Sequence, residues 1–123
     1  MLRLPYCVLL LGVVSIALAP RGAAAQSPFD GRWSVLFNTD RGDCEHSYRA
    51  GVRIYDGYIS ADASGFNLDG RVLRNGSVRA VISGQGQAAS GAGRLTRTQG
   101  GGVWRGRGSR GFCAGTWLAQ REE

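Results

Sequence analysis

The stretch Cys44–Ala61, CEHSYRAGVRIYDGYISA, decides the fold, because apolar and polar residues alternate along nearly all of it. In Cys44–Ile54 every second side chain is apolar or aromatic apart from His46, which is the period of a strand with one buried face. Asp56-Gly57 follows directly, and this dipeptide is typical of a type I′ turn, whose two central residues need positive φ. Tyr58–Ala61 is then the expected return strand. The stretch therefore predicts an antiparallel β-hairpin.

The two-residue period continues on both sides of this hairpin. Before it, Trp33, Val35 and Phe37 alternate with Arg32, Ser34 and Leu36. After it, a turn or bulge at Asp62–Gly65 leads to the expected inward positions Phe66, Leu68, Gly70 and Val72, and an Asn75-Gly76 hairpin signal leads to Val78, Ala80 and Ile82. The sequence thus predicts a succession of short antiparallel strands.

The last forty residues carry weaker signals. Gln85–Gly93 is either a loop or a sharply bent glycine-rich strand, and Arg94–Thr98 is expected to be extended. Gly100–Gly102 is expected to turn the chain. Val103–Gly108 and Phe112–Gln120 are the expected closing strands. No segment combines a helical period with helix caps.

Seven or eight short strands with turns about every ten residues predict an all-β domain, either a small antiparallel meander barrel or a sandwich. The chain has 20 glycines and only three prolines, threaded between β-branched and aromatic residues. That composition favours tightly coiled β structure over disorder. A barrel is favoured over a sandwich because closure removes the exposed edge strands.

Residues 1–25 are predicted to be a signal peptide rather than part of the fold. Cys7–Ala19 is an apolar segment too short to span a bilayer comfortably, and Ala23–Ala25 supplies small residues for cleavage before Gln26. The single β-barrel-like domain is therefore expected to be 26–123. We expect it to be exported to the periplasm or the medium of a bacterium, without a transmembrane span in the mature chain.

The cysteines fit an exported domain. Of the three in the chain, Cys7 falls within the predicted signal peptide, which leaves Cys44 and Cys113. An even pair in an oxidising compartment is typical of a disulfide, with two free thiols or a metal pair as the alternative. By alternation both lie on apolar strand faces, Cys44 on the second strand and Cys113 on the last. A bridge between them would close a loop of about 70 residues, for which the chain-entropy model gives roughly 4 kcal/mol.

Catalytic and metal-binding patterns are weak. His46 is the only histidine, and alternation points it toward the core, away from the neighbouring Ser47. Asp40, Asp43 and Glu45 could offer oxygen ligands to Ca²⁺, but their spacing matches neither an EF-hand nor an RTX nonapeptide, and a solvated turn is expected. We therefore expect no enzymatic activity, no metal and no cofactor.

Arginines give the clearest indication of a partner. All 15 basic residues are arginine, and the formal net charge is +6. If Trp104 faces inward, Arg105 and Arg107 project outward together, with Arg110 shortly after. The planar guanidinium suits carboxylate and phosphate oxygens, so these three residues are a candidate site for an anionic polysaccharide or lipopolysaccharide. The alternative is a solvated face that keeps the protein soluble. No nucleic acid is expected as a partner of an exported domain.

Three Gly-x-Trp elements recur, at Gly31–Trp33, Gly102–Trp104 and Gly115–Trp117. Their tryptophans either plug the ends of the barrel or line a ligand cavity. A Gly-x-Trp on the first strand and another on a closing strand is similar to avidin and lipocalin chains. The resemblance covers two short patches and carries no ligand over, because the longer loops and polar pocket residues of those families have no counterparts here. The mature sequence also resembles small exported proteins of alphaproteobacteria whose function is uncharacterised.

Together these features predict a small, exported, non-catalytic β-barrel that acts as a binding or envelope-associated module, with an anionic partner as one option. The alternative is a small-barrel inhibitor of a protease or lysozyme, which would present one rigid loop such as Asn38–Asp43.

Overall fold

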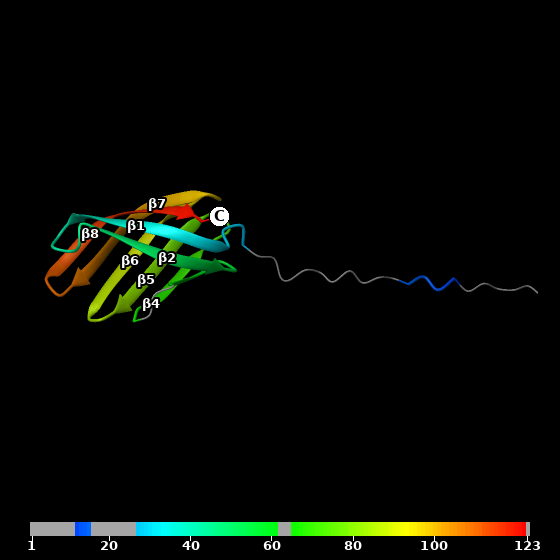
Figure 1. Cartoon of the computed structure of the whole chain (residues 1–123), viewed down its shortest axis with the longest axis horizontal. Helices are drawn as coiled ribbons and strands as arrows, with labels where there is room; N and C mark the ends of the chain where they lie inside the picture. Colours follow the sequence, from blue (N-terminus) through cyan, green and yellow to red (C-terminus); the bar gives the residue numbers. More distant parts are fainter. Residues whose placement is uncertain (1–11, 16–26, 62–64, 123) are drawn as a thin grey trace, which may run out of the picture.

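The alternating segments pair edge to edge into a closed antiparallel barrel in the computed structural model (Figure 1). The structure describes residues 12–15, 27–61 and 65–122. The strands are β1 (Gly31–Arg41), β2 (Ser47–Tyr55), β3 (Tyr58–Ala61), β4 (Asn67–Val72), β5 (Ser77–Gly84), β6 (Gln87–Leu95), β7 (Gln99–Gly108) and β8 (Gly111–Arg121). Each pairs with its neighbours in sequence, and β8 pairs back onto β1. The all-β prediction is confirmed, and of the two architectures the chain adopts the barrel.

Parts of the sequence predictions lie outside the described residues. These are most of the signal peptide and the Asp62–Ser64 part of the expected turn between β3 and β4. Within the ranges that are described, no helix is long and apolar enough to cross a membrane.

The two predicted hairpin turns form. Asp56 and Gly57 join β2 to β3 with φ of 49° and 78°, and the Asp30 carboxylate accepts their backbone N–H groups at 2.8 and 3.3 Å. Between β4 and β5, Gly76 has a φ of 90° and donates its N–H to the carbonyl of Leu73 at 2.8 Å. Turn chemistry at these positions therefore fixes the register of the strands on either side.

The turn between β6 and β7 differs from the sequence prediction, which had Arg94–Thr98 extended and the turn at Gly100–Gly102. Gly100–Gly102 does not turn the chain but lies within β7, and the chain reverses at Thr96–Thr98 instead, where the Thr96 hydroxyl donates to the carbonyl of Gln99 at 2.9 Å. The glycines serve close packing of β6 on β7 beneath the Trp117 ring. The segment left open as loop or strand is mostly β6, which follows a tight turn at Gln85-Gly86.

The start of the second strand was also predicted wrongly. β2 begins at Ser47, so Cys44 lies in the loop between β1 and β2 and not on an apolar strand face. His46 is exposed in the same loop rather than turned toward the core. The disulfide is the physical reason, because it holds Cys44 next to Cys113, near the start of the adjacent strand β8. Gly42, with a φ of 91°, permits the approach, since a Cβ there would lie 2.9 Å from the Cys113 sulfur.

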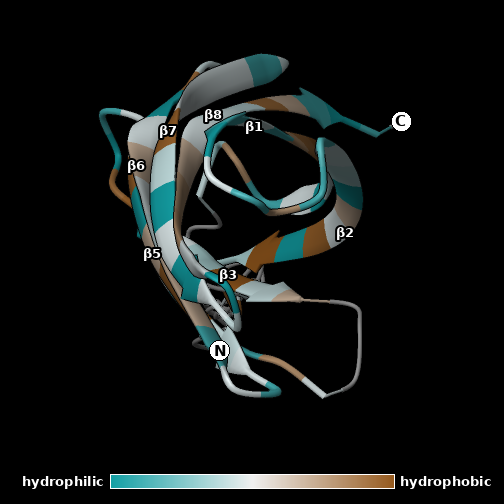
Figure 2. Cartoon of the chain, turned by 90° about the vertical axis from the view of Figure 1, so that its left-hand side faces the viewer, coloured by the Kyte–Doolittle hydropathy of each residue, from teal (hydrophilic) through white to brown (hydrophobic). Residues whose placement is uncertain are grey.

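Large buried side chains gather at one end of the barrel, which we call the closed end. It carries the β2–β3, β4–β5 and β6–β7 turns, whereas the opposite, open end carries the β1–β2, β5–β6 and β7–β8 turns (Figures 1 and 2). The buried cluster comprises Phe29, Trp33, Val35, Val52, Ile54, Val72, Val78, Leu95, Trp117 and Ala119. Trp33 is only 1% exposed and donates its indole N–H to the carbonyl of Phe29 at 2.8 Å.

Arg121 fastens the segment before β1 over this closed end. Its guanidinium donates to the carbonyls of Pro28 at 3.0 Å, Arg97 at 2.9 Å and Asp30, and it lies over the ring of Trp33 at 5.5 Å from the centroid. Three backbone carbonyls from two chain segments are thus satisfied by one side chain. The closed end is sealed by packing and by these charge-assisted hydrogen bonds.

The β6–β7 contact makes a prediction about two glycines on the same face of β6. A Cβ on Gly93 would lie 2.5 Å from Cζ2 of Trp117 and 2.8 Å from the Cα of Gly102, whereas one on Gly91 would be 3.5 Å or more from any neighbour. We expect Gly93→Ala to lower the unfolding free energy by about 1–3 kcal/mol through overpacking. Gly91→Ala, the matched control, should be neutral or stabilising. Urea unfolding of both variants measures this, and equal losses would contradict it.

Candidate ligand cavity

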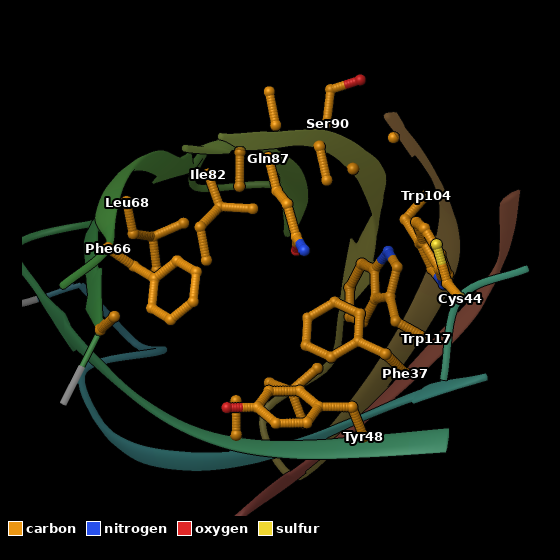
Figure 3. Close-up of a pocket in the computed structure, with 18 of the residues that line it drawn as sticks. Phe37, Cys44, Tyr48, Phe66, Leu68, Ile82, Gln87, Ser90, Trp104 and Trp117 are labelled. Carbon is orange, nitrogen blue, oxygen red and sulfur yellow. The ribbon is translucent and has the colours of Figure 1, made fainter. Parts of the chain in front are cut away.

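A cavity of about 930 Å³ occupies the barrel between the closed-end cluster and the open end (Figure 3). All eight strands contribute to its wall. A volume in this range is typical of small-molecule sites, and eight-stranded barrels are wide enough inside to hold one small ligand.

The wall is apolar and largely aromatic. Figure 3 shows Phe66, Leu68 and Ile82 on one side of the cavity, facing Phe37 and the tryptophans on the other. Phe37 and Trp104 pack edge to face, with ring centroids 6.5 Å apart and planes at 83°. This arrangement is a favourable geometry for aromatic pairs and fixes both rings in the wall.

The three tryptophans direct their indole N–H groups into the wall and not into the cavity. Trp104 donates to the carbonyls of Asn38 and Thr116, both at 3.1 Å, and Trp117 donates to that of Ala92 at 3.2 Å. Trp33 is the plug at the closed end, while half-buried Trp104 lines the wall. Both roles left open by the sequence therefore occur, in different tryptophans. The tryptophan rings therefore present their apolar carbon atoms, and not their N–H groups, to the cavity.

Most of the polar and charged residues that line this cavity lie toward its open end, among them Asp43, Glu45, Ser109 and Arg110. The Gln87 side chain extends into the cavity from the start of β6, and the Tyr48 hydroxyl points toward the side of the cavity on which Phe66 lies (Figure 3). Across the described ranges no polar or charged residue is buried. Tyr48 was among the expected inward residues, whereas Gln87 lies in the low-complexity segment, where no periodic signal marked its direction.

The Cys44–Cys113 disulfide forms, as the sequence predicts, with Cα atoms 6.1 Å apart. It lies at the rim of the cavity rather than in the barrel interior. It joins the β1–β2 loop to β8 and not the second strand to the last. The expected rigid loop Asn38–Asp43 is likewise mostly strand, because β1 extends to Arg41. The loop that an inhibitor would present is therefore the disulfide-anchored segment 42–46.

The predicted outward projection of Arg105 and Arg107 is confirmed. Both are exposed on β7, and the guanidinium of Arg107 lies 4.3 Å from the ring centroid of its cross-strand partner Phe112. Arg110 is exposed in the β7–β8 turn at the open end. Binding of an anion by these three residues stays a prediction.

The acidic loop residues make no metal site in the structure. Asp40 lies near the end of β1, and Asp43 and Glu45 are exposed in the loop that follows. In the part of the chain that is described, no group of three or more His, Cys, Asp or Glu side chains could hold a metal ion.

Fold and cavity define the class: a small up-and-down β-barrel with an interior cavity open at one end. Comparison with models of known protein families, with curated proteins and with solved structures finds no match.

The disulfide gives a prediction about stability. Replacing both cysteines, in Cys44→Ser/Cys113→Ser, should lower the unfolding free energy by about 2–5 kcal/mol, because the bridge restricts the unfolded chain and anchors the rim loop. Denaturant unfolding of the variant should coincide with that of the wild-type protein under reducing conditions, which serves as the control. An unchanged midpoint, or two free thiols in non-reducing peptide mapping of the wild type, would refute it.

Proposed function

We propose that this protein is a non-catalytic binding module that holds one small, largely apolar molecule inside its barrel. The observation that carries the proposal is the cavity of about 930 Å³ with an apolar, aromatic wall and an open end. Removing apolar ligand surface from water contributes about 25 cal/mol per Å², which is the driving force such a wall supplies.

The cavity stays open because several side chains that point into it are small. Protein interiors are normally close-packed, and a void forfeits the contacts of its lining. Here three inward positions of β6 and β7 beside the cavity are small, Ala89, Gly91 and Gly106, with Trp104 as the large side chain among them, while the bulky Trp33 and Leu95 stand at the closed end. The difference in side-chain size along the barrel supports a site and not a packing defect.

The chemistry of the wall sets the kind of ligand. A buried charge needs a partner. The charged residues that line the cavity include Asp43, Glu45 and Arg110, which lie in the turns at its open end, and none of the described residues carries a buried charge. The enclosed part of the ligand is therefore uncharged, and Gln87 and Tyr48 supply hydrogen bonds that orient one polar group.

Export belongs to the same proposal. The predicted signal peptide and the disulfide both support an oxidising compartment, the periplasm or the medium. There the module would carry or sequester its ligand.

The cavity predicts saturable binding of a neutral apolar probe, N-phenyl-1-naphthylamine, measured by its fluorescence. Ala89→Phe places a ring inside the cavity and should weaken binding by about tenfold or more, because it fills space the probe needs. Ala92→Phe, the same change on the outer face of β6, is the control and should leave affinity within about twofold. Circular dichroism establishes that both variants fold. No binding by the wild type, or equal effects of the two substitutions, would contradict the proposal.

A second candidate function is binding of an anionic polymer through Arg105, Arg107 and Arg110. The exposure of both β7 arginines on one face, with Arg107 stacked on Phe112, favours it. Side chains two apart on a strand lie about 6.5–7 Å apart, so one polyanion can meet both. Arg105→Ala/Arg107→Ala should then elute earlier than the wild type from a lipopolysaccharide resin in a salt gradient. Co-elution with the wild type would show that Arg105 and Arg107 form only a solvated face.

A further inference from the structure

Four exposed side chains form a straight row across the outside of β2, β3, β4 and β5. Tyr55 lies directly opposite Tyr58, Tyr58 opposite Arg71, and Arg71 opposite Arg79. All four are exposed, Tyr55 by 68% and Tyr58 by 54%. With strands about 4.8 Å apart, this Tyr–Arg row spans roughly 15 Å of the barrel wall. Two tyrosines thus lie beside two arginines in one line.

The row contains a guanidinium group stacked on a tyrosine ring and, next to it, a pair of like charges. The Arg71 guanidinium lies 4.8 Å from the ring centroid of Tyr58, which fixes its position. Arg71 and Arg79 are directly opposite each other, and like charges in that position destabilise a sheet. Among the described residues, the arginine side chains that donate hydrogen bonds within the protein are those of Arg49 and Arg121. An anion bridging the Arg71–Arg79 pair would turn its repulsion into attraction.

Positive charge extends beyond the row. Arg94 on β6 is exposed and lies diagonally next to Arg79, since it pairs with Ser77. At the other end, a hollow of about 280 Å³ beside Tyr55 is lined by Arg32 and Arg53.

Acidic residues near the row are few. Asp30, which also lines the hollow, has its carboxylate engaged with the backbone N–H groups of the Asp56-Gly57 turn. Asp69, exposed on β4, and Asp56, exposed in the turn between Tyr55 and Tyr58, are carboxylates on the flank of the row. Cations therefore outnumber anions along the row and its two ends.

We propose that the Tyr–Arg row binds an anionic polysaccharide. The C–H face of a sugar ring stacks on an exposed tyrosine, while a carboxylate or sulfate on the same or the next sugar meets the paired guanidinium groups. A row of roughly 15 Å suits a short stretch of a linear polymer. The disulfide indicates an oxidising compartment, where acidic polymers are mainly polysaccharides. The site lies outside the barrel and does not depend on the cavity ligand.

Titration calorimetry with a heparin oligosaccharide of defined length, repeated across a salt series, tests the proposal. Arg71→Ala/Arg79→Ala should weaken binding roughly tenfold at low salt, the product of two exposed ion pairs of a few-fold each, and should flatten the salt dependence. Tyr55→Ala should also weaken binding but keep the salt dependence, because no charge is lost. Arg41→Ala/Arg97→Ala removes the same charge from exposed positions outside the row and is the matched control.

The outcomes separate this site from the other proposals. Equal losses of affinity in Arg71→Ala/Arg79→Ala and in the control would show that net charge alone explains the effect. That result would overturn the row as the binding site. A loss in Arg105→Ala/Arg107→Ala with none in the row would place the anionic partner on β7 and also overturn it. A short DNA duplex that binds as tightly, with the same dependence on the row, would overturn the polysaccharide assignment. Unchanged binding of N-phenyl-1-naphthylamine by the row variant shows that fold and cavity are intact.

Discussion

The pairing of β8 with β1 is the constraint on which the rest of this structure depends. It runs from Trp33 opposite Arg121 to Arg41 opposite Ala114, and it joins the first strand to the last. Every strand then pairs on both sides for at least part of its length, so none of them is a free edge strand. Closure also creates an inside, and it brings the segment before β1 close to Arg121, which seals one end.

The distribution of side-chain size along the barrel decides what the inside becomes. Toward the closed end, Trp33, Ile54 and Leu95 meet and fill the cross-section. Toward the open end, several inward positions of β6 and β7 are alanine or glycine, so Trp104 and the aromatic rings of other strands border a space. The β6–β7 contact is tight in its glycine-rich part, where Gly93 faces Gly102 under the Trp117 ring. Glycine therefore serves close packing in one part of the wall and an open cavity in the other.

The outer surface follows a different rule, because nothing there is buried and only charge and exposure differ from strand to strand. Arginine projects from most strands, but its neighbours vary. On β7, Arg105 faces small residues and Arg107 covers Phe112. On β4 and β5, Arg71 and Arg79 face each other next to Tyr58 and Tyr55. The same residue type thus makes two different surfaces, distinguished by what the sheet register sets beside it.

Local pattern by itself determined the strands, two hairpin turns, the disulfide pair and the outward direction of Arg105 and Arg107. Each depends on the two-residue period or on turn residues close in sequence. Only the tertiary structure decided that Gly100–Gly102 packs within a strand, that Cys44 and His46 lie in a loop, and that a cavity remains between Phe66 and Trp104. The Tyr–Arg row also needed the fold, because alternation gives the face of a residue but not its partner on the next strand. Closure and register set those distances, and they are properties of the whole sheet.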